Sequence, residues 1–110
     1  MTDKIVVLCT CASADDGERL SRALLAEKLA ACVNVVTGIR SFFHWKGDID
    51  TADECLLLIK SSREQFDALR EAIEKLHPYE LPEILALPVL DGSPNYLQWL
   101  DSSLRPEPAK

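Results

Sequence analysis

The sequence predicts an α+β fold of the ferredoxin-like type, in the order βαββαβ with an additional C-terminal helix. Three observations predict it. Short apolar, β-branched segments alternate with segments whose apolar residues recur every three or four positions. The order strand, helix, strand occurs twice along the chain. The 110 residues, 47% of them hydrophobic and 27% charged, suit a single folded domain over residues 1–110.

The first strand and helix are predicted from the N-terminal third of the chain. Residues 4–10 form a continuous apolar run that is typical of a central strand. Ser13 followed by Asp16 predicts a capping box, in which the serine side chain accepts a hydrogen bond from the first turn of a helix. Apolar residues then recur on one broad face from Leu20 to Ala31, which predicts an amphipathic helix packed on the sheet.

The middle of the chain predicts a long β-hairpin. Residues 32–36 are short and β-branched, and Thr37-Gly38 predicts a bulge or turn after which residues 39–45 continue the strand. Residues 46–48 supply turn chemistry, and residues 54–60 form the next apolar strand. Asp48, Asp50, Asp53 and Glu54 are expected at a solvated hairpin tip, because they lack the spacing of a calcium loop.

The second half predicts another helix and an edge strand. A capping box of Ser61 with Glu64, or of Ser62 with Gln65, predicts the start of the helix. The helix is expected to end at His77, since a residue before proline is disfavoured in the helical region. Residues 83–89 carry prolines near both ends of a predicted strand, which favours the edge of the sheet.

The C-terminal segment predicts one short helix and a tail. Ser93 as N-cap with Pro94 at the first helical position favours a helix that carries Tyr96, Leu97, Trp99 and Leu100. Residues from about 104 to 110 are expected to form a flexible tail.

One face of the predicted sheet has no helix to cover it. Its strands are nevertheless apolar on both sides, and the hairpin adds Phe42, Phe43 and Trp45. A monomer would expose too large an apolar patch, so we expect further copies of the chain to cover this face and pair with its edges in a closed symmetric oligomer.

The net charge limits the classes of partner that the protein is expected to bind. The net charge of −6 argues against nucleic acid and anionic membranes, and no apolar run is long enough for a membrane span. The N-terminus lacks the pattern of a signal peptide, which favours a cytoplasmic location with four cysteines held as thiols. Those cysteines lack the spacing of a zinc framework.

Six segments together resemble the CutA divalent-cation-tolerance family, and they cover nearly the whole chain in order. The segments are Val7-Leu8-Cys9-Thr10, the run from Ala26 to Asn34, Trp45-Lys46-Gly47, Leu58-Ile59-Lys60-Ser61, His77-Pro78-Tyr79-Glu80-Leu81-Pro82-Glu83 and Tyr96-Leu97-Gln98-Trp99-Leu100. The resemblance implies a ferredoxin-like protomer, a homotrimer, a cytoplasmic protein with a role in tolerance of copper and other divalent metals, and no enzymatic activity.

The resemblance also implies a copper site. Its strand cysteine falls on Cys9 and the second of its two histidines on His77, while Leu76, which cannot bind metal, occupies the position of the first. The residues alone leave alternatives open. Cys9 and Cys11 would point to one face of a strand and could hold a soft cation, or both could pack as small apolar groups in the core. Equally, His77 could bind a metal or interact with the last carbonyls of its helix.

Four further aromatic and charged residues are candidates for a cleft or an interface. Trp45, Lys60, Tyr79 and Glu83 combine aromatic, hydroxyl and charged groups, which suits a small polar cleft or an interface. A trimer of this fold also resembles the PII signalling proteins, so the alternative function is the binding of a small anionic metabolite in clefts between subunits.

Cys32 and Cys55 are expected to pack in the core, and His44 is expected to lie at a surface or interface. The sequence lacks the motifs of a phosphate loop, a nucleophile elbow and a zinc protease.

Overall fold

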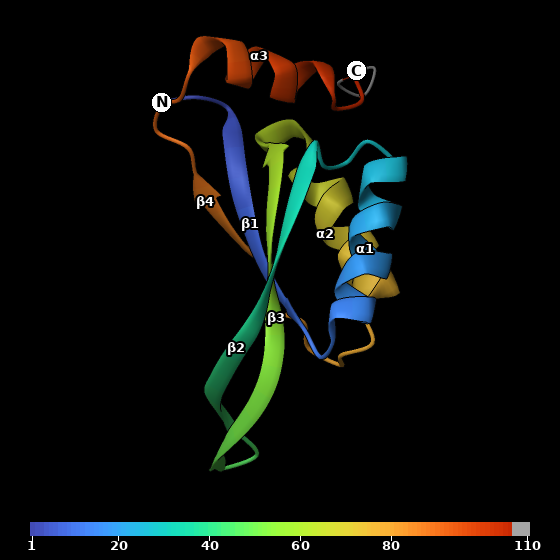
Figure 1. Ribbon diagram of the computed structural model, residues 1–110, viewed down its shortest axis with the longest axis vertical. Helices are drawn as coiled ribbons and strands as arrows, with labels where there is room; N and C mark the ends of the chain where they lie inside the picture. Colours follow the sequence, from blue (N-terminus) through green and yellow to red (C-terminus); the bar gives the residue numbers. More distant parts are fainter. Residues whose placement is uncertain (107–110) are drawn as a thin grey trace.

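Four antiparallel strands form one sheet in the order β2-β3-β1-β4, and helices α1 and α2 lie together on one side of it (Figure 1). The structure, a computed structural model, describes residues 1–106. The elements are β1 (Lys4–Cys11), α1 (Ala14–Ala26), β2 (Cys32–Trp45), β3 (Asp48–Ser62), the short 3₁₀ helix η1 (Arg63–Gln65), α2 (Phe66–Leu76), β4 (Leu85–Pro88) and α3 (Pro94–Ser102). This order and sheet topology confirm the predicted ferredoxin-like fold.

The core lies between the sheet and the two helices. Along β1 the odd-numbered residues from Ile5 to Cys11 are buried, because alternate side chains of a strand point to one face. Leu24 of α1 and Leu69 and Ile73 of α2 are fully buried against this face. The predicted cap of α1 is confirmed, since the Ser13 side chain accepts a hydrogen bond from the Asp16 N–H.

Strands β2 and β3 form a two-stranded arm that leaves the body of the molecule (Figure 1). The predicted bulge is confirmed, because the pairing register shifts between Val36 and Ile39, and Gly38 has a φ of 78° that glycine accommodates without strain. The arm is longer than predicted. β3 begins at Asp48, well before residue 54, because the acidic residues expected at the tip pair in register with residues 39–45 of β2.

The start of the second helix differs from the prediction. Ser61 and Ser62 are the last residues of β3, and neither caps a helix through its side chain. The Ser61 hydroxyl faces the core and donates to the Leu29 carbonyl oxygen at 2.6 Å, so it is not free to cap. The turn η1 intervenes before α2. The predicted end is confirmed, because His77 has an extended backbone directly after the helix.

The edge strand and the last helix lie where the sequence places them. β4 pairs only with β1 and is therefore an edge strand, as its prolines predict, although it is shorter than residues 83–89. Pro94 is the first residue of α3, and Ser93 occupies the N-cap position without a side-chain capping bond.

The prediction of a flexible tail from about residue 104 is wrong for residues 104 and 105. Leu104 is buried, and the Arg105 N–H donates to the Lys28 carbonyl oxygen at 3.0 Å. The Gln65 side chain holds Arg105 as well, through its amide at 2.9 Å and its carbonyl at 3.1 Å. Burial of the Leu104 side chain and the hydrogen bonds of Arg105 therefore attach residues 104 and 105 to the body of the molecule. Residues 107–110 lie outside the described part of the chain.

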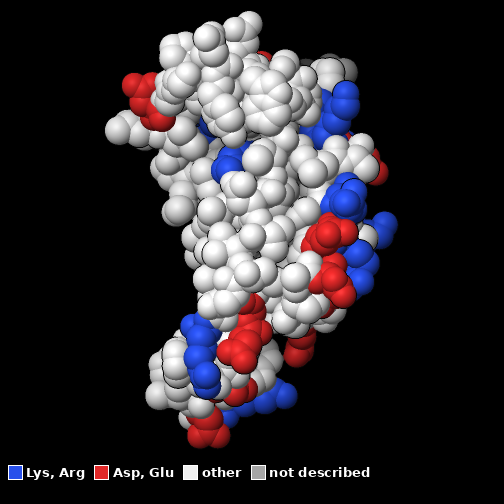
Figure 2. Space-filling model, viewed as in Figure 1, with Lys and Arg blue, Asp and Glu red and all other residues white. Residues whose placement is uncertain are grey.

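The arm and β4 expose large apolar side chains. Phe42 is 68% and Ile49 72% exposed on the arm, and Leu85 and Leu87 are about half exposed on β4. The face of the body seen in Figure 2 is largely uncharged, while charged side chains gather along one side and at the end of the arm. The described chain thus exposes the apolar surface that the sequence predicts.

Candidate metal centre

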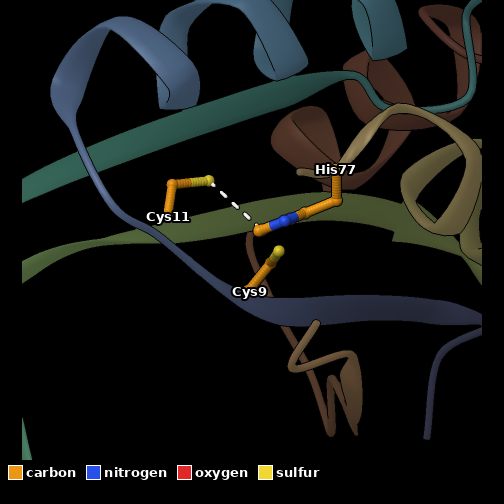
Figure 3. A group of neighbouring side chains, drawn as sticks. All are labelled: Cys9, Cys11 and His77. Carbon is orange, nitrogen blue, oxygen red and sulfur yellow. Dashed lines mark hydrogen bonds between the residues drawn. The ribbon is translucent and has the colours of Figure 1, made fainter. Parts of the chain in front are cut away.

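Two thiols and one imidazole converge on the core side of the sheet (Figure 3). The ligand atoms of Cys9, Cys11 and His77 lie within 4.8 Å of one another, and all three residues are buried. Cys11 Sγ is 3.7 Å from His77 Nε2. Within residues 1–106 this is the one cluster of three or more such groups that could hold a metal ion.

The topology explains the convergence. Cys9 and Cys11 are two residues apart on β1, so both side chains point into the core. β4 pairs with β1 only from Ile5 to Leu8, which leaves the β1 edge beyond Leu8 open to another segment. The chain that leaves α2 occupies this position, and its first residue is His77.

Both ring nitrogens of His77 have hydrogen-bond partners. Nε2 lies 2.8 Å from the Thr10 carbonyl oxygen, which can only accept, so Nε2 carries a proton. Nδ1 accepts the Tyr79 N–H at 3.1 Å. These partners assign the neutral Nε2–H tautomer, in which neither nitrogen has a lone pair free for a metal ion.

The two thiols shift each other's pKa in opposite directions. A hydrogen bond to Cys11, together with burial, raises the pKa of Cys9 far above its usual value. The interaction with Cys9 lowers the pKa of Cys11, although burial opposes the shift.

Carboxylates surround the thiols. Asp16 and Glu54 both act electrostatically on Cys11, and Glu54 and Glu83 act on Cys9, in each case raising the thiol pKa. Asp16, Arg19, Cys11 and His77 also line an open pocket of ≈ 350 Å³ between α1 and the end of α2. The pocket borders the cluster at Cys11 and His77, and the nearby carboxylates favour a cation over an anion.

The donor set fits a soft or borderline metal ion. Thiolate sulfur and imidazole nitrogen are ligands for copper and zinc, whereas hard cations such as Ca²⁺ prefer oxygen. The 3.7 Å between Cys11 Sγ and His77 Nε2 is compatible with one ion between them at bond lengths of about 2.0–2.3 Å. His77 would first have to release Thr10, so the thiols are the readier donors.

The four predicted cleft or interface residues do not come together within one chain. Tyr79 lies beside His77, with ring centroids 4.6 Å apart, and its hydroxyl donates to Glu54 at 2.7 Å. Burial and this carboxylate raise the pKa of Tyr79. Glu83 is exposed and acts on Cys9. Trp45 lies at the end of the arm, and Lys60 is paired with Cys32 at the opposite end of the β2–β3 ladder.

The other singled-out residues differ from one another in burial. Cys55 is buried in the core, as expected, with burial raising its pKa. Cys32 is half-buried, 3.8 Å from the Lys60 ammonium nitrogen, and His44 is exposed on the arm. Sequence reasoning gave no site role to Glu54, and nothing in the local pattern reveals one, because its partner Tyr79 is 25 positions away.

Comparison with known protein families shows which proteins this chain is related to. The family model described as "CutA1 divalent ion tolerance protein" matches residues 5–103. The chain belongs to the CutA1 family. The match includes Cys9, Cys11 and His77, so the whole cluster lies inside the region that defines the family.

Curated CutA proteins are close relatives. The chain is 44% identical over 95 residues to the divalent-cation tolerance protein CutA of Thermus thermophilus, which covers 86% of this chain and 92% of that protein. It is 45% identical over 101 residues to the chloroplastic protein CutA 1 of Oryza sativa, covering 92% of this chain. It spans only 57% of the rice protein's length.

Solved CutA structures share the fold. The structure of the divalent cation tolerance protein Cut A1 from Thermus thermophilus superposes with a TM-score of 0.91 at 41% identity, covering 93% of this chain and 99% of that chain. The family thus supports a role in tolerance of divalent metal ions. In residues 1–106 no helix is long and apolar enough to cross a membrane.

Proposed function

We propose that this CutA1-family protein binds copper, or another soft or borderline metal ion, through Cys9 and His77 with Cys11 as a further ligand. It would act in metal tolerance as a cytoplasmic protein without enzymatic activity. The observation that carries the proposal is the convergence of the two thiols and the imidazole within 4.8 Å.

The surroundings of the cluster support a cation. Asp16, Glu54 and Glu83 place negative charge around the thiols, and the chain as a whole carries −6. A field of this sign raises the local concentration of cations. It would do so without selecting one metal, and selection would then come from the sulfur donors, which favour Cu(I) among available ions.

We also propose that the protein is a homotrimer. A two-stranded ribbon such as the β2–β3 arm is marginally stable in water by itself. The arm nevertheless exposes Phe42, Phe43, Trp45 and Ile49. Burial of these side chains against another copy would remove apolar surface from water and hold the arm in place.

Trimer formation would also determine whether the predicted cleft residues Trp45 and Lys60 can lie in one cleft. Lys60 pairs with Cys32 at one end of the β2–β3 ladder, and Trp45 lies at the other end of β2. At about 3.3 Å per strand residue, Trp45 and Lys60 are about 40 Å apart. A cleft that contains both side chains would therefore need two chains. Binding of a small anionic metabolite in such a cleft is the alternative outcome of the experiment below.

Metal titration tests the proposal. Cu(I) and Zn²⁺ are titrated by competition with a chelator into the wild type, Cys9→Ser and His77→Ala, with Cys32→Ser and His44→Ala as controls outside the cluster. We expect the first two variants to lose affinity by tenfold or more while both controls match the wild type. Equal affinity in all five proteins, or binding of an anionic metabolite but no metal, contradicts the proposed site.

A further inference from the structure

The segment His77-Pro78-Tyr79 keeps the His77 ring in a hydrogen-bonded state that cannot bind a metal ion. The ring donates from Nε2 to Thr10 and accepts at Nδ1 from the Tyr79 N–H, at 2.8 and 3.1 Å. To bind a metal ion through Nε2, the ring would have to carry its proton on Nδ1. That proton would then point at the Tyr79 N–H, and two donors cannot share a hydrogen bond.

The position of Tyr79 is fixed by a second contact. Its hydroxyl donates to Glu54 Oε2 at 2.7 Å, which is a charge-assisted bond to a half-buried carboxylate on β3. Its ring packs on the His77 ring at a centroid distance of 4.6 Å. Pro78 has a restricted φ, so the three-residue segment is stiff and an anchor at Tyr79 also restrains His77.

From these contacts we infer that the Tyr79–Glu54 hydrogen bond is a latch that keeps His77 bonded to Thr10 and opposes its recruitment by a metal ion. The inference rests on the proposed function. When the latch opens, the Tyr79 N–H leaves Nδ1, the ring changes tautomer and Nε2 becomes available beside Cys11. The latch therefore sets how readily a two-thiol site becomes a three-ligand site.

The variant Tyr79→Phe removes the hydroxyl and keeps the ring. We expect the Tyr79→Phe protein to exchange the amide proton at position 79 at least about tenfold faster with solvent, since a hydrogen bond to a charged group is worth roughly a tenfold change or more. We also expect its Cu(I) affinity to rise about tenfold. Glu54→Gln, which weakens the acceptor, should also speed the exchange of the amide proton at position 79.

Tyr96→Phe is the matched control, because Tyr96 is exposed on α3. It should leave the exchange rate and the Cu(I) affinity at wild-type values. Unchanged exchange in Tyr79→Phe overturns the latch, as does faster exchange with unchanged or weaker Cu(I) binding. If neither the wild type nor Tyr79→Phe binds Cu(I), the proposed function fails, while the exchange rate, measured without metal, still shows whether the hydroxyl restrains the segment.

Discussion

His77 donates a hydrogen bond from Nε2 to the backbone carbonyl oxygen of Thr10 at 2.8 Å. This carbonyl lies on the part of the β1 edge that β4 does not reach, since β4 pairs with β1 only as far as Leu8. The imidazole thus takes the place of a neighbouring strand, and its other nitrogen accepts the Tyr79 N–H. One side chain serves both the strand edge and the candidate metal centre.

Loss of this side chain should destabilise the fold. His77→Ala leaves the Thr10 carbonyl and the Tyr79 N–H without their partner, and an unsatisfied buried polar group costs about 1–3 kcal/mol. We expect the free energy of unfolding in urea to fall by that amount. His44→Ala, at an exposed position on the arm, should change it by no more than about 0.5 kcal/mol. Equal effects of the two substitutions would contradict the structural role.

Charge on the arm should disrupt assembly. Phe42→Asp and Ile49→Asp place a carboxylate where the side chains are 68% and 72% exposed in one chain and buried in the proposed trimer. We expect wild-type protein to sediment at three times the mass of one chain and the variants to dissociate at micromolar concentration. Leu25→Asp, at a 39% exposed position on α1, should remain a trimer. A wild type that sediments as a monomer would refute the trimer.

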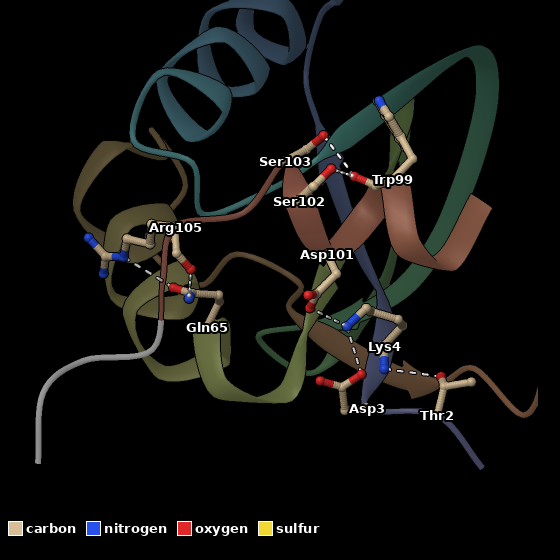
Figure 4. A network of polar contacts seen from close by, with 9 residues as sticks. All are labelled: Thr2, Asp3, Lys4, Gln65, Trp99, Asp101, Ser102, Ser103 and Arg105. Atoms are coloured by element: carbon tan, nitrogen blue, oxygen red, sulfur yellow. Dashed lines mark hydrogen bonds and ion pairs between the residues drawn. The ribbon is translucent and has the colours of Figure 1, made fainter. Parts of the chain in front are cut away.

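The buried Lys4 ammonium should make stability depend on its two carboxylates (Figure 4). Lys4 Nζ contacts Asp3 at 2.7 Å and Asp101 at 2.9 Å, and its side chain is 5% exposed. Loss of both carboxylates leaves a buried charge unpaired, whereas loss of Lys4 leaves two acids that water can solvate. Asp3→Asn with Asp101→Asn should therefore destabilise the protein by at least about 1 kcal/mol more than Lys4→Met. The reverse order would contradict this assignment.

Acid should weaken the same network. The hydrogen bond from Lys4 lowers the pKa of Asp3 below its ordinary value of 3.8, so the folded state binds the proton less readily than the unfolded chain. The stabilisation is present above pH 3.8 and is lost as the pH falls through the lower, folded-state pKa. Unfolding titrations of wild type and Asp3→Asn should converge there. A constant difference between them at all pH values would exclude this linkage.

The sequence predicts those parts of the fold that depend on local pattern. The Ser13 cap, the bulge near Gly38 and the helix end at His77 each follow from the chemistry of neighbouring residues. The Ser61 and Ser62 caps are wrong because both serines continue β3, and Ser61 bonds to Leu29, which is distant along the chain. A tertiary partner overrides the local capping signal there.

The candidate site is predictable only in part for the same reason. Alternation along a strand places Cys9 and Cys11 on one face, and this needs no knowledge of the fold. The approach of His77 to them depends on how far β4 extends along β1, and the hydrogen bond from Tyr79 to Glu54 joins two separate segments. Neither relationship has a signature in the residues next to the partners.

X-ray absorption of the copper-loaded protein identifies the atoms bound to the metal and so tests directly whether the two thiols are ligands. We expect sulfur neighbours at about 2.2–2.3 Å in the wild type, close to the metal–sulfur distance found for zinc thiolates. One sulfur should be lost in Cys9→Ser and one in Cys11→Ser, with no change in Cys32→Ser. Copper bound only by nitrogen and oxygen, or sulfur ligation that survives both substitutions, would contradict the site at Cys9, Cys11 and His77.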